Sequence, residues 1–159
     1  MANQIYLVIK GKKQGLISAG CSSYDSIGNK YQDGHENEIF VYSTNYSMSR
    51  HQNVSHSPFS FAKLDDKSTP LLMNSINNNE LLDCEFSFYR TDRSGKSIVY
   101  KTIKLTNASI VSISNHHPNA LDNNDAQAYE TVSMKYESIT CEHKAANTSS
   151  YSITQNLVN

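Results

Sequence analysis

The side chains best suited to metal binding in this sequence are its histidines and cysteines. Most of them fall into three short groups: His51 with His56, His116 with His117, and Cys141 with His143. Structural zinc sites combine a close pair such as CxxC with a second pair such as HxxxH, and the spacings in this sequence give no such combination. We therefore expect exposed histidines, and neither a bound metal nor another cofactor.

Nucleophilic catalysis would need a Ser or Cys held against a base, and the sequence offers no motif for it. It contains no GxSxG turn, and its GKKQG segment at 11–15 lacks the spacing and the GK[ST] ending of a phosphate-binding loop. Cys84 alternates with polar neighbours and is expected in the core. Cys141 is compatible with either a buried or an exposed position. Asp65 and Asp66 precede an expected helix, where a carboxylate favours the helix dipole. We expect no enzymatic activity.

Composition excludes several kinds of partner. The formal net charge is −1, and Lys and Arg are scattered rather than clustered, which argues against nucleic acid or a polybasic membrane anchor. The three cysteines, Cys21, Cys84 and Cys141, are far apart, so free thiols in a reducing compartment are expected. The first residues lack the basic and apolar regions of a signal peptide. We expect synthesis in the cytoplasm and, if the protein leaves the cell, export without such a peptide.

The elements that must position these residues are mostly strands. From 82 to 88, Leu82, Cys84, Phe86 and Phe88 alternate with polar residues, which is typical of a strand with one buried face. Similar short segments are expected at 5–10, 38–42, 59–64, 98–105, 108–114 and 130–139. The pattern predicts about seven or eight strands in one domain over residues 1–159.

One short helix is expected to begin near Ser68. Ser68 could cap the first turn, and Pro70 is tolerated there because its missing N–H would have no helical partner. Residues 11–34 are expected to be mainly turns, and the polar segment from 145 to pair only partly. The fold class is thus mainly β: a barrel or sandwich of two sheets, one short flanking helix, and a long extended loop at 43–57.

Four stretches, in order along nearly the whole chain, resemble the Hcp (haemolysin co-regulated protein) family of type VI secretion tube subunits. They are IYLVIKG at 5–11, EIFVY at 38–42 with the polar loop after it, DKSTPLL at 66–72, and YKTIKL at 100–105 with the strands that follow. The third stretch is the most distinctive.

This resemblance implies a function as well as a fold. It implies a homo-hexameric ring of β-barrels, stacked into the inner tube of a bacterial contractile injection machine. A sheath would surround the tube, a spike protein would cap it, and small effectors could occupy its lumen. The protein would be cytoplasmic before firing and would then be secreted to the extracellular space or a target cell.

The loop at 43–57 is the expected subunit contact. Ordering its backbone costs about 1–2 kcal/mol per residue, so contacts must offset that cost, and the resembled family places its extended loop against a neighbouring subunit. The expected contact residues are Ser47, Met48, Arg50, His51, Asn53, Val54 and His56, with the two histidines as pH-sensitive members. The alternative is a monomeric β-sandwich module that recognises a ligand through this loop.

Overall fold

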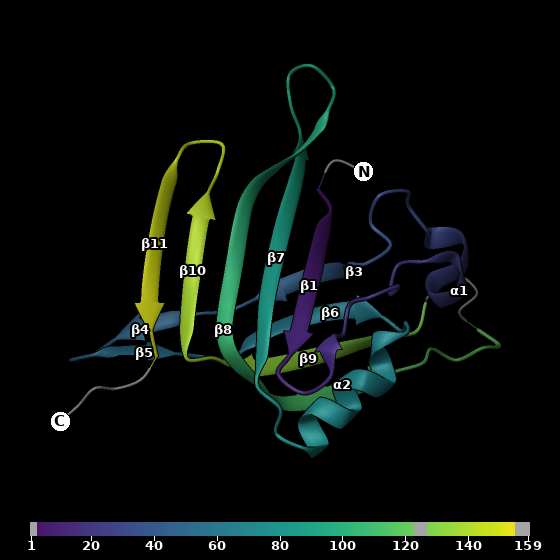
Figure 1. Ribbon diagram of the computed structural model, residues 1–159, viewed down its shortest axis with the longest axis horizontal. Helices are drawn as coiled ribbons and strands as arrows, with labels where there is room; N and C mark the ends of the chain where they lie inside the picture. The colour runs from purple at the N-terminus through teal and green to yellow at the C-terminus, as the bar shows by residue number, and fades with distance from the viewer. Residues whose placement is uncertain (1–2, 123–126, 155–159) are drawn as a thin grey trace.

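Six antiparallel strands close into a barrel, as the computed structural model shows for residues 3–122 and 127–154 (Figure 1). They are β1 (Ile5–Gly11), β3 (Ile39–Asn45), β6 (Phe59–Leu64), β7 (Leu82–Thr91), β8 (Ser97–His116) and β9 (Tyr129–Lys135). The order β8-β7-β1-β3-β6-β9 returns to β8, which closes the cycle. The predicted mainly β fold is therefore confirmed.

β8 closes the barrel because it is long and bends. Its first part pairs with β7, and its second part, from Ser109 to His116, pairs with β9. Just before the second part begins, Asn107 has φ 49°, a left-handed conformation that Asn tolerates better than most residues. The sequence suggested two separate strands here, at 98–105 and 108–114. That prediction was wrong, because Asn107 bends the strand without ending it.

A hairpin extends the sheet beyond the barrel. β10 (Ser138–His143) pairs with β8, and β11 (Thr148–Ile153) pairs with β10 over its full length. Partial pairing was expected for this polar tail. Backbone hydrogen bonds hold it in the sheet although its side chains show no buried face.

The core lies inside the barrel, as the alternation predicted. Leu82, Cys84, Phe86 and Phe88 are all buried, and Phe86 is completely so. The Phe86 ring lies 4.7 Å from that of Phe59 on β6, centroid to centroid. The two walls of the barrel therefore meet through aromatic contact.

The predicted helix is α2 (Ser68–Asn77), which packs Leu72 into the core. Its cap differs from the expectation. The Oδ1 atom of Asp66 accepts hydrogen bonds from the Ser68 backbone N–H and hydroxyl, while Ser68 is itself the first helical residue and is buried. The N-cap position is Lys67, whose side chain makes no capping hydrogen bond, so Ser68 is not the cap and the Asp66 carboxylate satisfies the N–H group of the first helical residue.

The segment expected as turns at 11–34 holds short elements: β2 (Gly15–Leu16), α1 (Tyr24–Ile27) and the 3-10 turn η1 (Gly28–Lys30). With the strands described below, the described residues form more strands than the seven or eight expected. The polar segment that joins β8 to β9 lies partly outside the described residues, since these omit 123–126. Within the described ranges, no helix is long and apolar enough to cross a bilayer.

Candidate subunit interface

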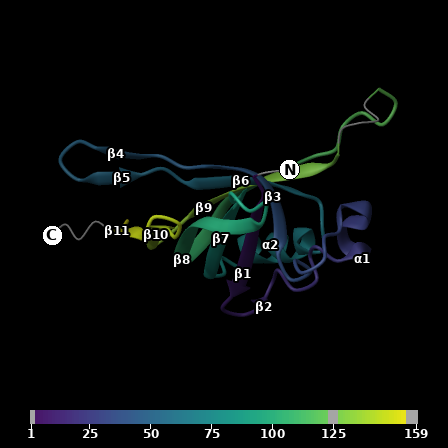
Figure 2. The same ribbon diagram turned by 90° about the horizontal axis from the view of Figure 1, so that it is seen from above.

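The segment between β3 and β6 is a projecting two-stranded ribbon, which we call the arm (residues 46–58). Its strands are β4 (Met48–Arg50) and β5 (Val54–His56), and among the described residues they pair only with each other. Figure 2 shows the arm extending well beyond the barrel. Residues 51–53 form the tip, where the His51 N–H lies 3.4 Å from the Asn53 carbonyl oxygen. The predicted extended loop is thus an ordered ribbon.

Two serines close the base of the arm. The Ser47 N–H and hydroxyl each lie 2.8 Å from Ser57 Oγ, and the Ser57 N–H donates to the Ser47 carbonyl at 3.0 Å. Ser47, an expected contact residue, therefore holds the two strands together where they leave the barrel.

The two faces of the arm differ in chemistry. Met48 lies opposite His56 and Arg50 lies opposite Val54, and side chains of paired residues share a face. The other face carries the Ser49–Ser55 pair. Met48 and Val54 are 45% and 42% exposed, so two apolar side chains and a cation lie together in solvent. This face has the composition expected of a contact surface.

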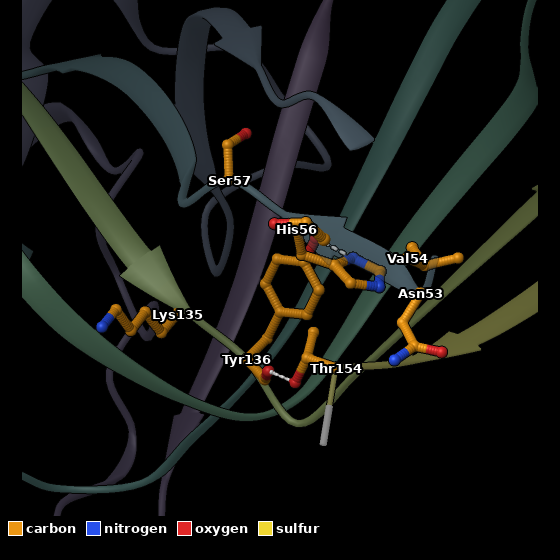
Figure 3. Close-up of a pocket in the computed structure, with 8 residues that line it drawn as sticks. Asn53, Val54, His56, Ser57, Lys135, Tyr136 and Thr154 are labelled. Carbon is orange, nitrogen blue, oxygen red and sulfur yellow. Dashed lines mark hydrogen bonds between the residues drawn. The ribbon is translucent and has the colours of Figure 1, made fainter. Parts of the chain in front are cut away.

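His56 has a different environment from the other predicted contact residues. Its Nδ1 lies 2.9 Å from the Tyr136 hydroxyl (Figure 3). Its Nε2 lies 3.0 Å from Ser152 Oγ. Burial raises the pKa of Tyr136, so its hydroxyl stays protonated and can donate to Nδ1. The Nε2 proton is then available to Ser152. His56 thereby links the arm to the β10–β11 hairpin.

A cavity of about 430 Å³ lies beside this link. The arm supplies residues 53–57 to its wall, and the remaining lining residues are Lys135 at the end of β9, Tyr136 in the β9–β10 turn and Thr154 just after β11 (Figure 3). The Thr154 hydroxyl donates to the Tyr136 carbonyl oxygen. The predicted contact residues of the arm lie near one another in the structure. The partners of His56, Tyr136 and Ser152, are 80 or more positions away in the sequence.

The residues considered for chemistry do not form one site. His143 packs edge-on against Tyr100, and His116 packs against Tyr129. Among the described residues, no group of three or more His, Cys, Asp or Glu side chains is placed to hold a metal ion. Burial raises the pKa of Cys21 to about 12 and also raises that of Cys84, so both thiols stay protonated.

A buried ionic cluster was missed by the sequence analysis. Lys63 Nζ is fully buried and lies 2.6 Å from Glu130 Oε1 and 3.0 Å from Asp66 Oδ1. It joins β6, β9 and the start of α2. Phe59, Phe61 and Lys63 alternate along β6 and point the same way, so the strand period placed this lysine inside. That alternation was the available signal.

Comparisons with known proteins agree with this architecture. The family described as "Type VI secretion system effector, Hcp" matches residues 6–143. The major exported protein of Pseudomonas aeruginosa is 36% identical over 162 residues, covering 94% of each chain. YhhZ of Escherichia coli strain K12 is 44% identical over 153 residues, covering 93% of this chain, which spans only 37% of YhhZ.

Solved structures show the same likeness. A crystal structure described as Hcp protein has a TM-score of 0.92 and 36% identity, with 98% of this chain and 99% of that chain covered. The secreted protein Hcp3 from Pseudomonas aeruginosa has a TM-score of 0.88 and 33% identity, with 98% and 100% covered. On this sequence match over most of its length, the chain belongs to the Hcp family of type VI secretion proteins.

Proposed function

We propose that this chain is a structural subunit of a type VI secretion inner tube, which forms hexameric rings that stack. Family membership supports this, as do the names of two relatives, a major exported protein and a secreted Hcp3. The proposal includes the sheath and spike as neighbours, small effectors as cargo in the lumen, and export from the bacterial cytoplasm.

The observation that carries the proposal is the arm. It is ordered, yet within the described residues its strands pair only with each other, and Met48 and Val54 remain exposed. Backbone ordering costs about 1–2 kcal/mol per residue, and self-pairing offsets only part of this cost. Contact with a neighbouring subunit supplies the remainder. The contact set we propose is the face with Met48, Arg50 and Val54, with His51 and Asn53 at the tip.

A catalytic role is not part of the proposal. The thiols of Cys21 and Cys84 are buried and protonated, and the histidines that lie in strands are on three different ones: His56 on β5, His116 on β8 and His143 on β10. A tube subunit needs no reaction of its own, since its task is to assemble and later come apart.

The test is to shorten the arm between Ser47 and Ser55 with a two-residue turn. The barrel should stay folded, with an unchanged β spectrum by circular dichroism, because none of residues 47–55 packs against the core, whereas Tyr46, which does, is kept. Assembly, measured by light scattering across a concentration series, should shift to higher concentration. An unchanged concentration dependence would show that the arm is not the contact.

A matched pair of substitutions sharpens the test. Met48→Ser with Val54→Ser removes the apolar side chains from one face, whereas Ser49→Ala with Ser55→Ala changes only the other. The first pair should weaken assembly and the second should not. Equal effects would mean that the arm acts without a preferred face.

A further inference from the structure

The turn that joins β1 to β2 encloses a buried carboxylate. Residues 11–15 form this turn, which we call the GKKQG loop, and it lies at the same end of the barrel as α2 (Figure 1). Glu80 follows α2 and is only 3% exposed. Its carboxylate is therefore removed from water and needs hydrogen-bond donors from the protein.

The GKKQG loop supplies three such donors. The backbone N–H groups of Lys13 and Gln14 both donate to Glu80 Oε2 at 2.8 Å, and Gln14 Nε2 donates to Glu80 Oε1 at 2.8 Å. Successive backbone N–H groups in a turn form a concave nest that suits an anion. The loop lacks the sequence of a nucleotide phosphate-binding loop, but it presents the same kind of donor.

The shape of the loop fits the carboxylate. A Cβ atom on Gly11 would overlap Glu80 Oε2, so glycine leaves room that a larger residue would fill. Asn79 has φ 50°, a left-handed conformation at the point where the chain leaves α2 for Glu80. Burial raises the pKa of Glu80, but hydrogen bonds from Gln14 and Lys13 outweigh this effect and the pKa is lowered, so the group stays ionised.

The same residues tie the loop to α2. Gln14 Nε2 also lies 3.1 Å from the Leu71 carbonyl oxygen and 3.0 Å from Ser75 Oγ, and both acceptors are on α2. The Glu80 N–H donates to the Ser75 carbonyl oxygen at 3.0 Å. Loss of the carboxylate should therefore loosen the loop and the last turn of α2 together, while β1 keeps its ladder with β7.

We propose that the GKKQG loop is an oxyanion-binding loop whose resident ligand is the Glu80 carboxylate of the same chain. This ligand is a latch, because it holds the loop against α2. A vacant loop binds a free carboxylate of matching size. Glu80→Ala removes a methylene and a carboxylate group, which together have the size of acetate. The arm takes no part in this site, so the proposal stands or falls independently of assembly.

Chemical rescue by acetate tests the proposal. In Glu80→Ala, the amides of residues 12–15 should exchange their hydrogens about tenfold faster than in the native chain, as measured by mass spectrometry, because their acceptor is gone. Sodium acetate should restore slow exchange in a saturable way, whereas sodium chloride at the same ionic strength should not. The native chain should respond to neither salt, since its own carboxylate fills the loop.

Glu80→Gln is the matched control. Its amide has the same shape, keeps one acceptor oxygen and turns the other position into a donor, which faces the donors of the loop. Exchange should again be faster than in the native chain, but acetate should not slow it because no space is vacant. If Glu80→Ala does not fold in buffer alone, it should fold in acetate and not in chloride.

Three results would overturn the proposal. Slow exchange in Glu80→Ala without an added anion would show that the loop keeps its shape without a ligand. Fast exchange that acetate leaves unchanged, or failure to fold in either salt, would show that the vacant loop does not bind a carboxylate. Equal rescue by acetate and chloride would assign the effect to ionic strength alone.

Discussion

Replacing Lys63 should be among the most damaging substitutions in the barrel. Its ammonium is fully buried and lies 2.6 Å from Glu130 and 3.0 Å from Asp66, so Lys63→Met leaves two carboxylates without their cation. Removing one partner of a buried ion pair typically costs about 3–5 kcal/mol of unfolding free energy. The loss should fall in that range, since methionine fills a similar volume and little of the cost comes from a cavity.

A second variant separates charge from packing. Glu130→Gln removes one carboxylate but leaves Lys63 paired with Asp66, and the amide can still contact the Thr69 hydroxyl, 3.2 Å away in the native chain. Its loss should be about 1–2 kcal/mol, the range for a weakened buried hydrogen bond. The double variant Lys63→Met with Glu130→Gln should lose less than the sum of the two single losses.

The assay is urea unfolding followed by circular dichroism, with all variants at the same subunit concentration because assembly adds to apparent stability. Two results would refute the argument that the cluster is a coupled buried network. One is a loss below about 1 kcal/mol for Lys63→Met, and the other is a loss in the double variant equal to the sum of the two single losses.

Three further outcomes are expected. Phe86→Ala should cost about 3–5 kcal/mol in urea unfolding because its ring is fully buried, and a loss below about 1 kcal/mol would contradict the core assignment. Gly11→Ala should cost about 1–3 kcal/mol in the same assay, since the added Cβ would lie 2.1 Å from Glu80 Oε2; an unchanged midpoint would show that Glu80 moves freely. A thiol reagent at pH 8 should modify Cys141 rapidly. It should modify Cys21 and Cys84 only on unfolding, because both are buried and their raised pKa keeps the thiols protonated. Modification of all three at one rate would argue against this burial.

Much of the fold could be predicted because side-chain alternation reports which face of a strand is buried. The segment from Leu82 to Phe88 and the helix beginning at Ser68 are local patterns, and both are confirmed. Barrel closure could not be predicted, because it depends on β8 continuing past Asn107 to a second partner. The polar strand β11 gave no signal, since its pairing comes from the backbone alone.

The candidate site was predicted less completely. The arm could be recognised as a long polar segment, but which residues share a face depends on its register, Met48 opposite His56. The partners of His56, Tyr136 and Ser152, are distant in the sequence and come close only in the folded chain. Lys63 shows the same limit, because a lysine in a strand is usually taken as exposed.

The most direct test of the proposed tube subunit is the native mass of the purified chain across a concentration range. We expect a species of six chains of 17.8 kDa each, with larger multiples at high concentration as rings stack. A single-chain mass at every concentration would contradict the account and favour a monomeric binding module.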